Sequence, residues 1–221
     1  APDMRVSSIN LASEAWLTAL GAWQVLQTMR LCPYQRLQAF EQADSVVTFS
    51  AKNIKRDHLG HIVENNLLQL ALWQQFGPNI QCFCPASVTA LEQSTSTATV
   101  KLDDGTMISS QLVIAADGGN SQLRQLADMG TNGWQYSQGC LVALVNTEYP
   151  QQDVTWQQFT PSGPKAFLPL PGKQGSIVWY ESAPKAKQLA ALSGPQLTQE
   201  LLKAFPPQLG KVDVIASIWF P

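Results

Sequence analysis

The sequence predicts a mixed α/β (α+β) fold in two parts, which we place at residues 1–131 and 132–221. In the first part, apolar residues at three-and-four spacing indicate helices, and short apolar runs between turn residues indicate strands. In the second part, short strands separated by Pro- and Gly-containing turns are typical of an antiparallel sheet. The first part is therefore expected to be mixed α/β and the second to be a sheet with covering helices.

Two segments of the first part have the clearest helical patterns. One runs from Ala12 to Leu20 and is followed by Gly21, a residue that favours a helix C-terminus. The other is predicted over 62–76 and ends before Gly77-Pro78, because proline cannot continue a helix. Short strands are predicted at 37–40, 46–49, 80–84, 87–91 and 97–102.

The second part is predicted to begin with a four-stranded antiparallel meander and to end on a single strand. Two helices are expected between them, and Pro206-Pro207 ends the second. The meander strands are predicted at 140–147, 154–160, 166–170 and 176–181, the helices at 184–192 and 196–205, and the last strand at 212–220.

The composition excludes several classes of protein. The 221 residues are 45% hydrophobic and 14% charged, which is enough to bury a sizeable core and argues against disorder. The net charge of -2 gives no basic patch for nucleic acid. No apolar run approaches the roughly 20 residues that span a bilayer. We therefore expect a cytoplasmic protein with no transmembrane segment.

The cysteines and histidines do not predict a metal site or a catalytic triad. Cys82-x-Cys84 resembles half of a zinc site, but no second Cys/His pair has a suitable spacing. We interpret both as reduced strand residues, which suits the cytosol. The two histidines, His58 and His61, are assigned to a loop and to the start of the 62–76 helix.

The stretch Gln111–Arg124 carries the chemistry of the chain. Its apolar run 112–116 is typical of a buried strand, Asp117-Gly118-Gly119 breaks it, and Asn120 or Ser121 can cap a following helix. A glycine turn that leads into a helix N-terminus favours anions. Asp117 can accept a hydrogen bond from a ribose hydroxyl, or it can simply cap the helix. Arg124 can bind a phosphate, or it can pair with a neighbouring carboxylate and hold the turn.

The string Asp117-Gly118-x-x-Ser121-x-x-Arg124 resembles the second nucleotide motif of the FAD-dependent aromatic hydroxylases typified by p-hydroxybenzoate hydroxylase. Other strings resemble the bacterial ubiquinone-biosynthesis hydroxylases of this group, and the similarity covers nearly the whole chain. Two of these strings, Trp134–Gln138 and Thr155–Leu170, are most similar to the member that hydroxylates an octaprenyl methyl-methoxy-benzoquinol. The strings are Asp3–Ser7, Gly60–Asn65, Trp134–Gln138 and Thr155–Leu170.

This resemblance implies a partial FAD-binding domain followed by an antiparallel substrate-binding sheet. It also implies FAD and NAD(P)H as cofactors. The family's GxGxxG loop and its Gly-Asp-Ala-Ala-His segment do not occur among these residues. We therefore expect the chain to be a fragment of a longer hydroxylase that cannot hold FAD tightly and is inactive by itself.

The resemblance also implies roles for individual residues. Arg5 is expected near the flavin or the nicotinamide phosphates, unless it is a surface arginine. Glu64 lies where relatives place a polar residue at the flavin, but it can equally be a helix N-terminal carboxylate. The cofactor candidates are thus Arg5, Glu64, Asp117, Gly118, Ser121 and Arg124, and no catalytic residue is assigned.

Five residues of the predicted sheet are substrate-binding candidates: Gln138, Trp156, Gln158, Phe167 and Trp179. The aromatic residues among them can instead be core residues, since alternating aromatics commonly pack inside a sheet. A prenylated quinol substrate needs an apolar channel, and the sequence leaves open which face of the sheet forms it. The resemblance further implies association with other ubiquinone-biosynthesis enzymes and allows peripheral membrane contact.

Two other functions remain open at this point. A flavin-linked dehydrogenase or reductase can share the Asp-Gly motif and a sheet domain. A non-catalytic module that binds a prenyl-quinone or a protein is compatible with the missing FAD segments.

Overall fold

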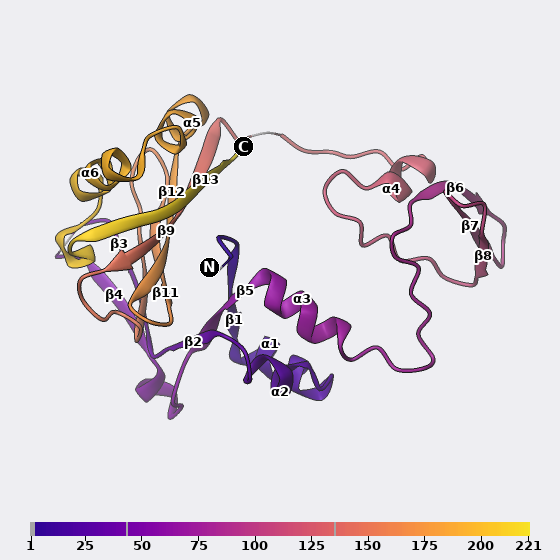
Figure 1. The fold of residues 1–221 in the computed structure, drawn as a ribbon, viewed down its shortest axis with the longest axis horizontal. Coiled ribbons are helices and arrows are strands. Elements are labelled where there is room, and N and C mark those ends of the chain that lie inside the picture. Colours follow the sequence, from indigo (N-terminus) through magenta and orange to yellow (C-terminus); the bar gives the residue numbers. More distant parts are fainter. Residues whose placement is uncertain (1–2, 43, 135) are drawn as a thin grey trace. The chain divides into compact units, whose positions relative to one another are not determined.

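The computed structural model describes residues 3–42, 44–134 and 136–221, whose elements are labelled in Figure 1. Contacts between residues divide the chain into two compact units. Unit 1 comprises Ala1–Phe76 and Ser137–Pro221, and unit 2 comprises Gly77–Tyr136. The boundary that the sequence predicts between residues 131 and 132 falls inside unit 2. That boundary divides the chain by function, and it stays a prediction.

A seven-stranded sheet forms the larger part of unit 1, and only its β10–β3 pair is parallel among the described strands. The predicted meander holds for β10, β11 and β12, whereas β9 pairs with β12 and β13 instead of β10. Two strands from the first part of the chain, β3 and β4, extend the sheet. The order is β13 (Val212–Phe220), β9 (Gln138–Thr147), β12 (Gln174–Ser182), β11 (Lys165–Leu170), β10 (Val154–Gln158), β3 (Arg36–Phe40) and β4 (Val46–Ser50).

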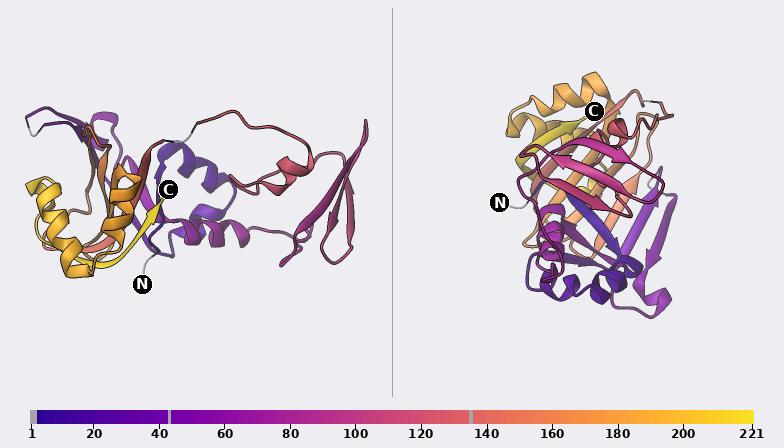
Figure 2. Two further views of the ribbon diagram at one scale, coloured as in Figure 1. Left: turned by 90° about the horizontal axis from the view of Figure 1, so that it is seen from above. Right: turned by 90° about the vertical axis from the view of Figure 1, so that its right-hand side faces the viewer.

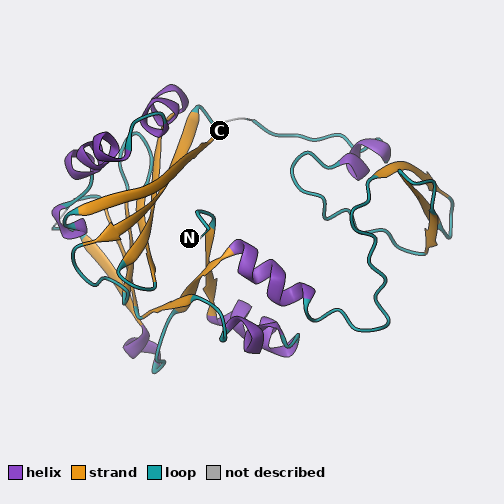
Figure 3. Cartoon of the chain, viewed as in Figure 1, coloured by secondary structure: helices purple, strands orange, loops and turns teal. Residues whose placement is uncertain are grey.

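Two predicted helices, α5 (Ala183–Ala190) and α6 (Gly194–Ala204), cover one face of this sheet (Figure 3). Their buried leucines pack against every second residue of the strands, because successive side chains of a strand point to opposite faces. Burying one large apolar side chain stabilises the fold by about 1.5–3 kcal/mol. This core contains Leu141, Ala143, Trp156, Phe167, Ile177, Trp179, Leu189, Leu197 and Leu201.

A second, three-stranded sheet in unit 1 has β5 at its centre and carries three helices, α1, α2 and α3. The predicted helix from Ala12 is confirmed. Asn10 caps it by accepting a hydrogen bond from the Ser13 N–H at 2.9 Å, and Gly21 follows it with φ +81°. The bounds are β1 (Val6–Asn10), β5 (Gly60–Glu64), β2 (Leu31–Tyr34), α1 (Leu11–Ala19), α2 (Ala22–Leu26) and α3 (Asn65–Trp73).

The helix predicted over 62–76 begins later than the sequence indicates. Residues 60–64 form β5 and are all buried. All five pair with β1, residues 60–63 also pair with β2, and α3 starts only at Asn65. Ile62 and Val63 are β-branched and favour a strand. A short apolar run next to a helical pattern looks like part of that helix, because its periodicity does not separate the two. His61 therefore lies on a strand.

Unit 2 contains an antiparallel sheet of three strands, β6 (Val88–Gln93), β7 (Ala98–Leu102) and β8 (Met107–Ser110), and the short helix α4 (Gln122–Leu126) (Figure 2). The strands predicted at 87–91 and 97–102 are confirmed. The strand predicted at 80–84 is wrong, since those residues pair with no described strand.

The buried strand predicted at 112–116 is also wrong. Leu112 is 73% exposed and Ile114 is 76% exposed. No described strand pairs with this segment. A strand is stable only when a neighbour accepts and donates its backbone hydrogen bonds, so apolar sequence alone does not produce one.

No helix among the described residues is both long enough and apolar enough to cross a membrane.

The packing around Phe167 predicts a large loss of stability on truncation. Its ring is fully buried between Trp156 and Ile177, and any side chain at Gly175 would overlap it. We expect Phe167→Ala to lower the free energy of unfolding by about 3–5 kcal/mol, measured by urea denaturation. Phe159→Ala is the control, because Phe159 is 49% exposed. Equal losses in the two variants would contradict this packing.

Candidate functional site

The face of the large sheet opposite α5 and α6 carries a pocket of about 250 Å³. Strands β9 and β12 form its floor, and the residues before and after the small sheet form its rim. The side chains of β9 and β12 that reach it alternate with those of the core. It is lined by Met4, Arg5, Val6, Asn65, Cys140, Val142, Ser176, Val178, Tyr180 and Phe220.

A second pocket of about 310 Å³ lies on the same face and shares Val178 and Tyr180 with the first. Its other lining residues come mainly from β10 and β11. Ala166, Leu168 and Pro164 make it largely apolar, and Gln157 adds one amide. The two pockets therefore continue one another along the sheet, with a polar end and an apolar end.

Three polar side chains of β9 and β12 line the first pocket. The hydroxyl of Ser176 is buried, its side chain is 1% exposed, and it has no hydrogen-bond partner among the described residues. The charge of a Cys140 thiolate and burial both raise the pKa of the Tyr180 phenol. Burial raises the pKa of Cys140. Tyr180 and Cys140 are therefore neutral at pH 7, and the phenol is available as a hydrogen-bond donor.

Arg5 places a positive charge at the rim of the first pocket. Its guanidinium carbon lies 5.4 Å from the centre of the Phe220 ring, a cation–π distance. Its carbonyl accepts a hydrogen bond from the Asn65 N–H at 3.0 Å, which fixes the chain where β5 turns into α3. The predicted contact of Arg5 with a cofactor stays a prediction.

Glu64 is buried, 3% exposed, and both of its carboxylate oxygens are occupied. Arg30 donates to Oε1 at 2.8 Å and to Oε2 at 3.0 Å, and the Asp3 N–H donates to Oε2 at 2.7 Å. Burial alone would raise the pKa of Glu64, but these hydrogen bonds outweigh it and lower the pKa. Its side chain does not cap α3. A flavin contact of Glu64 stays a prediction.

In unit 2, the polar groups of the Asp-Gly motif form hydrogen bonds with one another. Both oxygens of Asp117 accept hydrogen bonds, one from the Ser121 hydroxyl and the other from the N–H groups of Gln122 at 2.8 Å and Leu123 at 3.1 Å. These bonds lower the pKa of Asp117, the Ser121 bond most strongly. Ser121 caps α4 by accepting from the Arg124 N–H at 3.0 Å, as predicted.

Arg124 holds the glycine turn, since its Nη1 donates to the Gly119 carbonyl at 3.0 Å. Gly118 has φ +85° and open space where a side chain would lie. A pocket of about 570 Å³ beside the motif is lined by Gly118, Ser121 and Arg124, together with apolar residues of β6 and of the exposed 112–115 segment. The cofactor role of this motif stays a prediction. Its internal hydrogen bonds are those expected if Asp117 caps the helix.

Four of the five substrate candidates lie on the helix-covered side of the sheet. Trp156, Phe167 and Trp179 are buried in the core and line neither sheet pocket. Gln158 pairs with Lys165 on that side, and its amide donates to the Glu41 carbonyl at 3.3 Å. The structure therefore places none of these four in either sheet pocket.

Gln138 is the one candidate on the face of the sheet that carries the pockets. It precedes Cys140 by two residues on β9, so the two side chains are on the same face. Its amide donates to the Ser162 carbonyl at 2.8 Å. Sequence reasoning missed Ser176, Val178 and Tyr180, three residues of β12 that line the pockets. The alternation of residues along β12 predicts that Ser176 and Val178 face the side opposite Ile177 and Trp179. It does not predict which of the two sides α5 and α6 cover.

An alignment of 222 positions that covers the whole chain gives 43% identity to the 3-demethoxyubiquinol 3-hydroxylase of Escherichia coli (strain K12). The chain is a homologue of the ubiquinone hydroxylases. An alignment of 226 positions that covers 96% of the chain gives 30% identity to the mitochondrial ubiquinone biosynthesis monooxygenase COQ6 of Rattus norvegicus. The chain spans 57% and 47%, respectively, of these relatives. No protein-family model matches it.

Solved structures confirm the predicted fold class. The p-nitrophenol 4-monooxygenase PnpA of Pseudomonas putida superimposes on the whole chain with a TM-score of 0.77 at 12% identity, covering 58% of PnpA. HpxO of Klebsiella pneumoniae, solved with FAD and uric acid, superimposes on 97% of the chain with a TM-score of 0.70 at 17% identity, covering 58% of HpxO. The mixed α/β chain of this ubiquinone-hydroxylase homologue therefore has the fold of flavin-dependent monooxygenases.

The Glu64–Arg30 pair predicts a pH-dependent loss of stability on substitution. We expect Glu64→Gln to destabilise the chain at pH 7 by about 2 kcal/mol, the usual range for a hydrogen bond to a charged group. The pKa of Glu64 is lowered by folding, so its contribution is present above the ordinary carboxyl pKa and lost as the pH falls through the lowered one. The measurement is urea denaturation between pH 7 and pH 4.

Glu200→Gln is the matched control, because Glu200 pairs with Lys203 on the surface. It should change stability little at either pH. A Glu64→Gln variant as stable as this control at pH 7 would argue that the buried pair contributes nothing.

Proposed function

We propose that the whole protein is a flavin-dependent monooxygenase that hydroxylates a polyprenyl benzoquinol or phenol in ubiquinone biosynthesis. The identity of 43% along the complete chain to a 3-demethoxyubiquinol 3-hydroxylase carries this proposal. The pockets on the open face of the sheet support it, because they offer a place for a ring and an adjoining apolar place for a tail. The alternatives of a flavin-linked reductase and a non-catalytic binding module have no such support.

The chemistry of the first pocket suits a quinol ring. Val142 and Val178 present flat apolar contacts, while Ser176 and Tyr180 present hydroxyl groups that can pair with ring oxygens. The unpaired hydroxyl of Ser176 is the strongest candidate among these groups. A hydrogen bond from a ligand stabilises a buried polar group most when that group has no other partner. We assign Ser176 and Tyr180 to orientation of the ring.

The apolar end continues along β11 and suits the first units of a prenyl tail. Leu168 and Ala166 line it, and burial of each CH₂ group there stabilises the complex by about 0.8 kcal/mol. The pocket is small relative to a long prenyl chain. We propose that the rest of the tail extends from the protein and allows a peripheral membrane contact.

FAD would supply the activation of oxygen, with NAD(P)H as the source of electrons. The open space at Gly118, with its positive φ, permits close approach of a bound group to the backbone. We propose Arg5 as one cofactor contact and, separately, the motif Asp117, Gly118, Ser121 and Arg124 as another; Glu64 supports the loop that carries Arg5. Segments of the relatives that this chain does not span are proposed to hold the FAD pyrophosphate.

We further propose that residues 1–131 belong to the FAD-binding part and 132–221 to the substrate-binding part, with β3 and β4 contributed to the substrate sheet. The proposed location is the cytoplasm, with association with other enzymes of ubiquinone biosynthesis. The electrons, oxygen and ring must meet at one place from which water is excluded, and the chain's role is to position the ring there.

The test of the proposed activity uses the whole protein purified with FAD. A short-chain demethoxyubiquinol should stimulate NAD(P)H oxidation, and mass spectrometry should find one atom from ¹⁸O₂ in the product. Pyridine-nucleotide oxidation without incorporation of ¹⁸O would favour a reductase. Binding of the quinol by a protein that does not bind FAD would favour the binding module.

Substitution of Ser176 should separate ligand binding from stability. We expect Ser176→Ala to leave the urea midpoint unchanged or slightly raised, because it removes a hydroxyl with no partner. The KM for the quinol should rise about tenfold, the equivalent of one hydrogen bond of about 1.4 kcal/mol. Steady-state kinetics of the whole protein measure it.

Thr155→Val is the control for this substitution. Thr155 is also buried in the sheet, but its hydroxyl donates to the Phe167 carbonyl at 2.8 Å. The control should lose stability and keep its KM. A Ser176→Ala variant with that same pattern would show that Ser176 is structural.

A further inference from the structure

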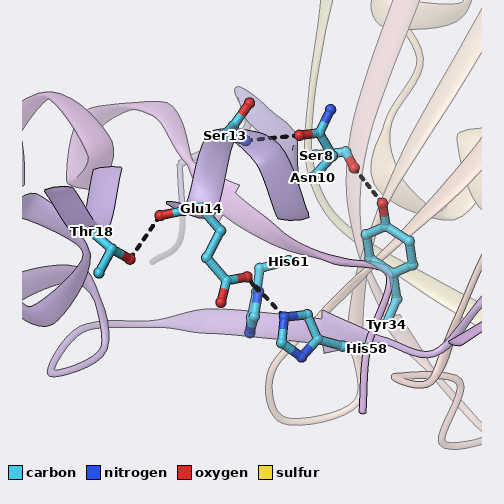
Figure 4. A network of polar contacts seen from close by, with 8 residues as sticks. All are labelled: Ser8, Asn10, Ser13, Glu14, Thr18, Tyr34, His58 and His61. Carbon is cyan, nitrogen blue, oxygen red and sulfur yellow. Dashed lines mark hydrogen bonds and ion pairs between the residues drawn. The ribbon is translucent and has the colours of Figure 1, made fainter. Parts of the chain in front are cut away.

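A cluster of three potential metal ligands lies in unit 1, away from the pocket residues. Glu14 comes from α1, His58 from the loop before β5, and His61 from β5 itself (Figure 4). These are the only two histidines of the chain. Sequence analysis predicted no metal site. Glu14 and His58 are 44 residues apart in the sequence, and the fold brings them together.

The three ligand atoms are spaced as a small metal ion requires. Oε2 of Glu14 lies 2.8 Å from Nε2 of His58 and 3.3 Å from Nδ1 of His61, and all three atoms lie within 4.8 Å of one another. Ligands at about 2.0–2.1 Å from a tetrahedral Zn²⁺ are about 3.4 Å apart. Small side-chain rotations therefore suffice to enclose an ion.

The buried nitrogen of His61 points to a ligand independently of this spacing. His61 is only 8% exposed. Its Nδ1 has no hydrogen-bond partner among the described residues, although Oε2 of Glu14 lies 3.3 Å away. A buried polar atom without a partner is costly, and a metal ion would satisfy it.

The rings are held in place by their surroundings. His61 packs edge-on against Trp23 at 5.0 Å and against His58 at 4.4 Å between ring centres. Burial, and then the neighbouring His58, lower the pKa of His61, while Glu14 opposes this. Edge-on packing on two sides therefore restrains the His61 ring.

The backbone that carries Glu14 is anchored as well. The Thr18 hydroxyl donates to the Glu14 carbonyl at 2.8 Å, and Asn10 caps the same helix through Ser13 (Figure 4). On the neighbouring strands, the Ser8 and Tyr34 hydroxyls are 2.8 Å apart. Ligands on an anchored helix and a central strand lose little freedom when an ion binds.

We propose that Glu14, His58 and His61 bind a divalent transition-metal ion, Zn²⁺ being the best fit, through two imidazole nitrogens and one carboxylate oxygen. This donor set suits Zn²⁺ and leaves a fourth position for water. The ion joins α1 to β5, the strand that leads into Glu64 and Asn65. Its role is to stabilise unit 1, and it takes no part in the proposed oxygen chemistry.

The test is a Zn²⁺ titration of the 221-residue chain by calorimetry at pH 7.5. The chain carries Cys82→Ser and Cys84→Ser, because those two exposed thiols are the other plausible zinc ligands. We expect one Zn²⁺ per chain and a higher thermal midpoint with Zn²⁺, since the ion binds the folded state. Binding should weaken as the pH falls, because protons compete with Zn²⁺ for the ligand atoms.

Two variants of the ligands and one matched control decide the assignment. His58→Gln and Glu14→Gln should each weaken Zn²⁺ binding at least about tenfold, while circular dichroism shows that both remain folded. Asp57→Asn, a change at the exposed neighbour of His58, should bind as the parent does. X-ray absorption should find only nitrogen and oxygen ligands.

Three outcomes would overturn the proposal. The first is the absence of saturable binding in the chain with Cys82→Ser and Cys84→Ser when the parent binds, which would assign the ion to Cys82 and Cys84. The second is unchanged affinity in both His58→Gln and Glu14→Gln. The third is no saturable binding in any form, which would leave the cluster as an ion pair with a neighbouring buried imidazole.

Discussion

The alternation of side chains across the seven-stranded sheet is the constraint on which the rest of unit 1 depends. On β12, Ile177 and Trp179 point to one face and Ser176 and Val178 to the other. Because α5 and α6 seal the first face with apolar side chains, the second face is the one left for a ligand. A shift of one residue in the register of β12 would exchange the two sets and remove both the core and the pocket.

The small sheet gives this open face its polar rim. Leu144 and Leu170 of the large sheet pack against Cys32, Tyr34 and Ile62, which come from the small sheet. This contact sets Arg5 and Asn65 beside the pocket. The buried Glu64–Arg30 pair holds the chain at the same point, through the bond from the Asp3 N–H. The pocket thus depends on contacts between segments that are far apart in sequence.

Sequence reasoning found the elements with strong local signals. The helix from Ala12, the strands of the second part and the cap at Ser121 are local, because spacing, turns and capping residues specify them. It failed where partners far along the chain decide the outcome. Ile62 and Val63 became strand residues because β1 and β2 pair with them. The 112–116 run has no described partner and forms no strand.

The candidate site follows the same rule. The Asp117 motif is contiguous in the sequence, so both its possible cofactor role and its possible role as a helix cap could be predicted from the sequence. The pocket residues come from strands β9 and β12 and from the start of the chain, and only their folded arrangement identifies them. The cluster of Glu14, His58 and His61 was the hardest to predict, because Glu14 is 44 residues from His58 and the sequence gives no sign that they meet.

The most direct test of substrate binding on the open face is the affinity of the whole protein for a short-chain prenylated quinone after Val178→Trp. Val178 lines both pockets, points away from the core, and can be enlarged without disturbing α5 or α6. Binding on the open face predicts that the variant keeps its thermal midpoint and loses quinone binding. A variant that binds the quinone as tightly as the parent would place the substrate elsewhere and contradict it.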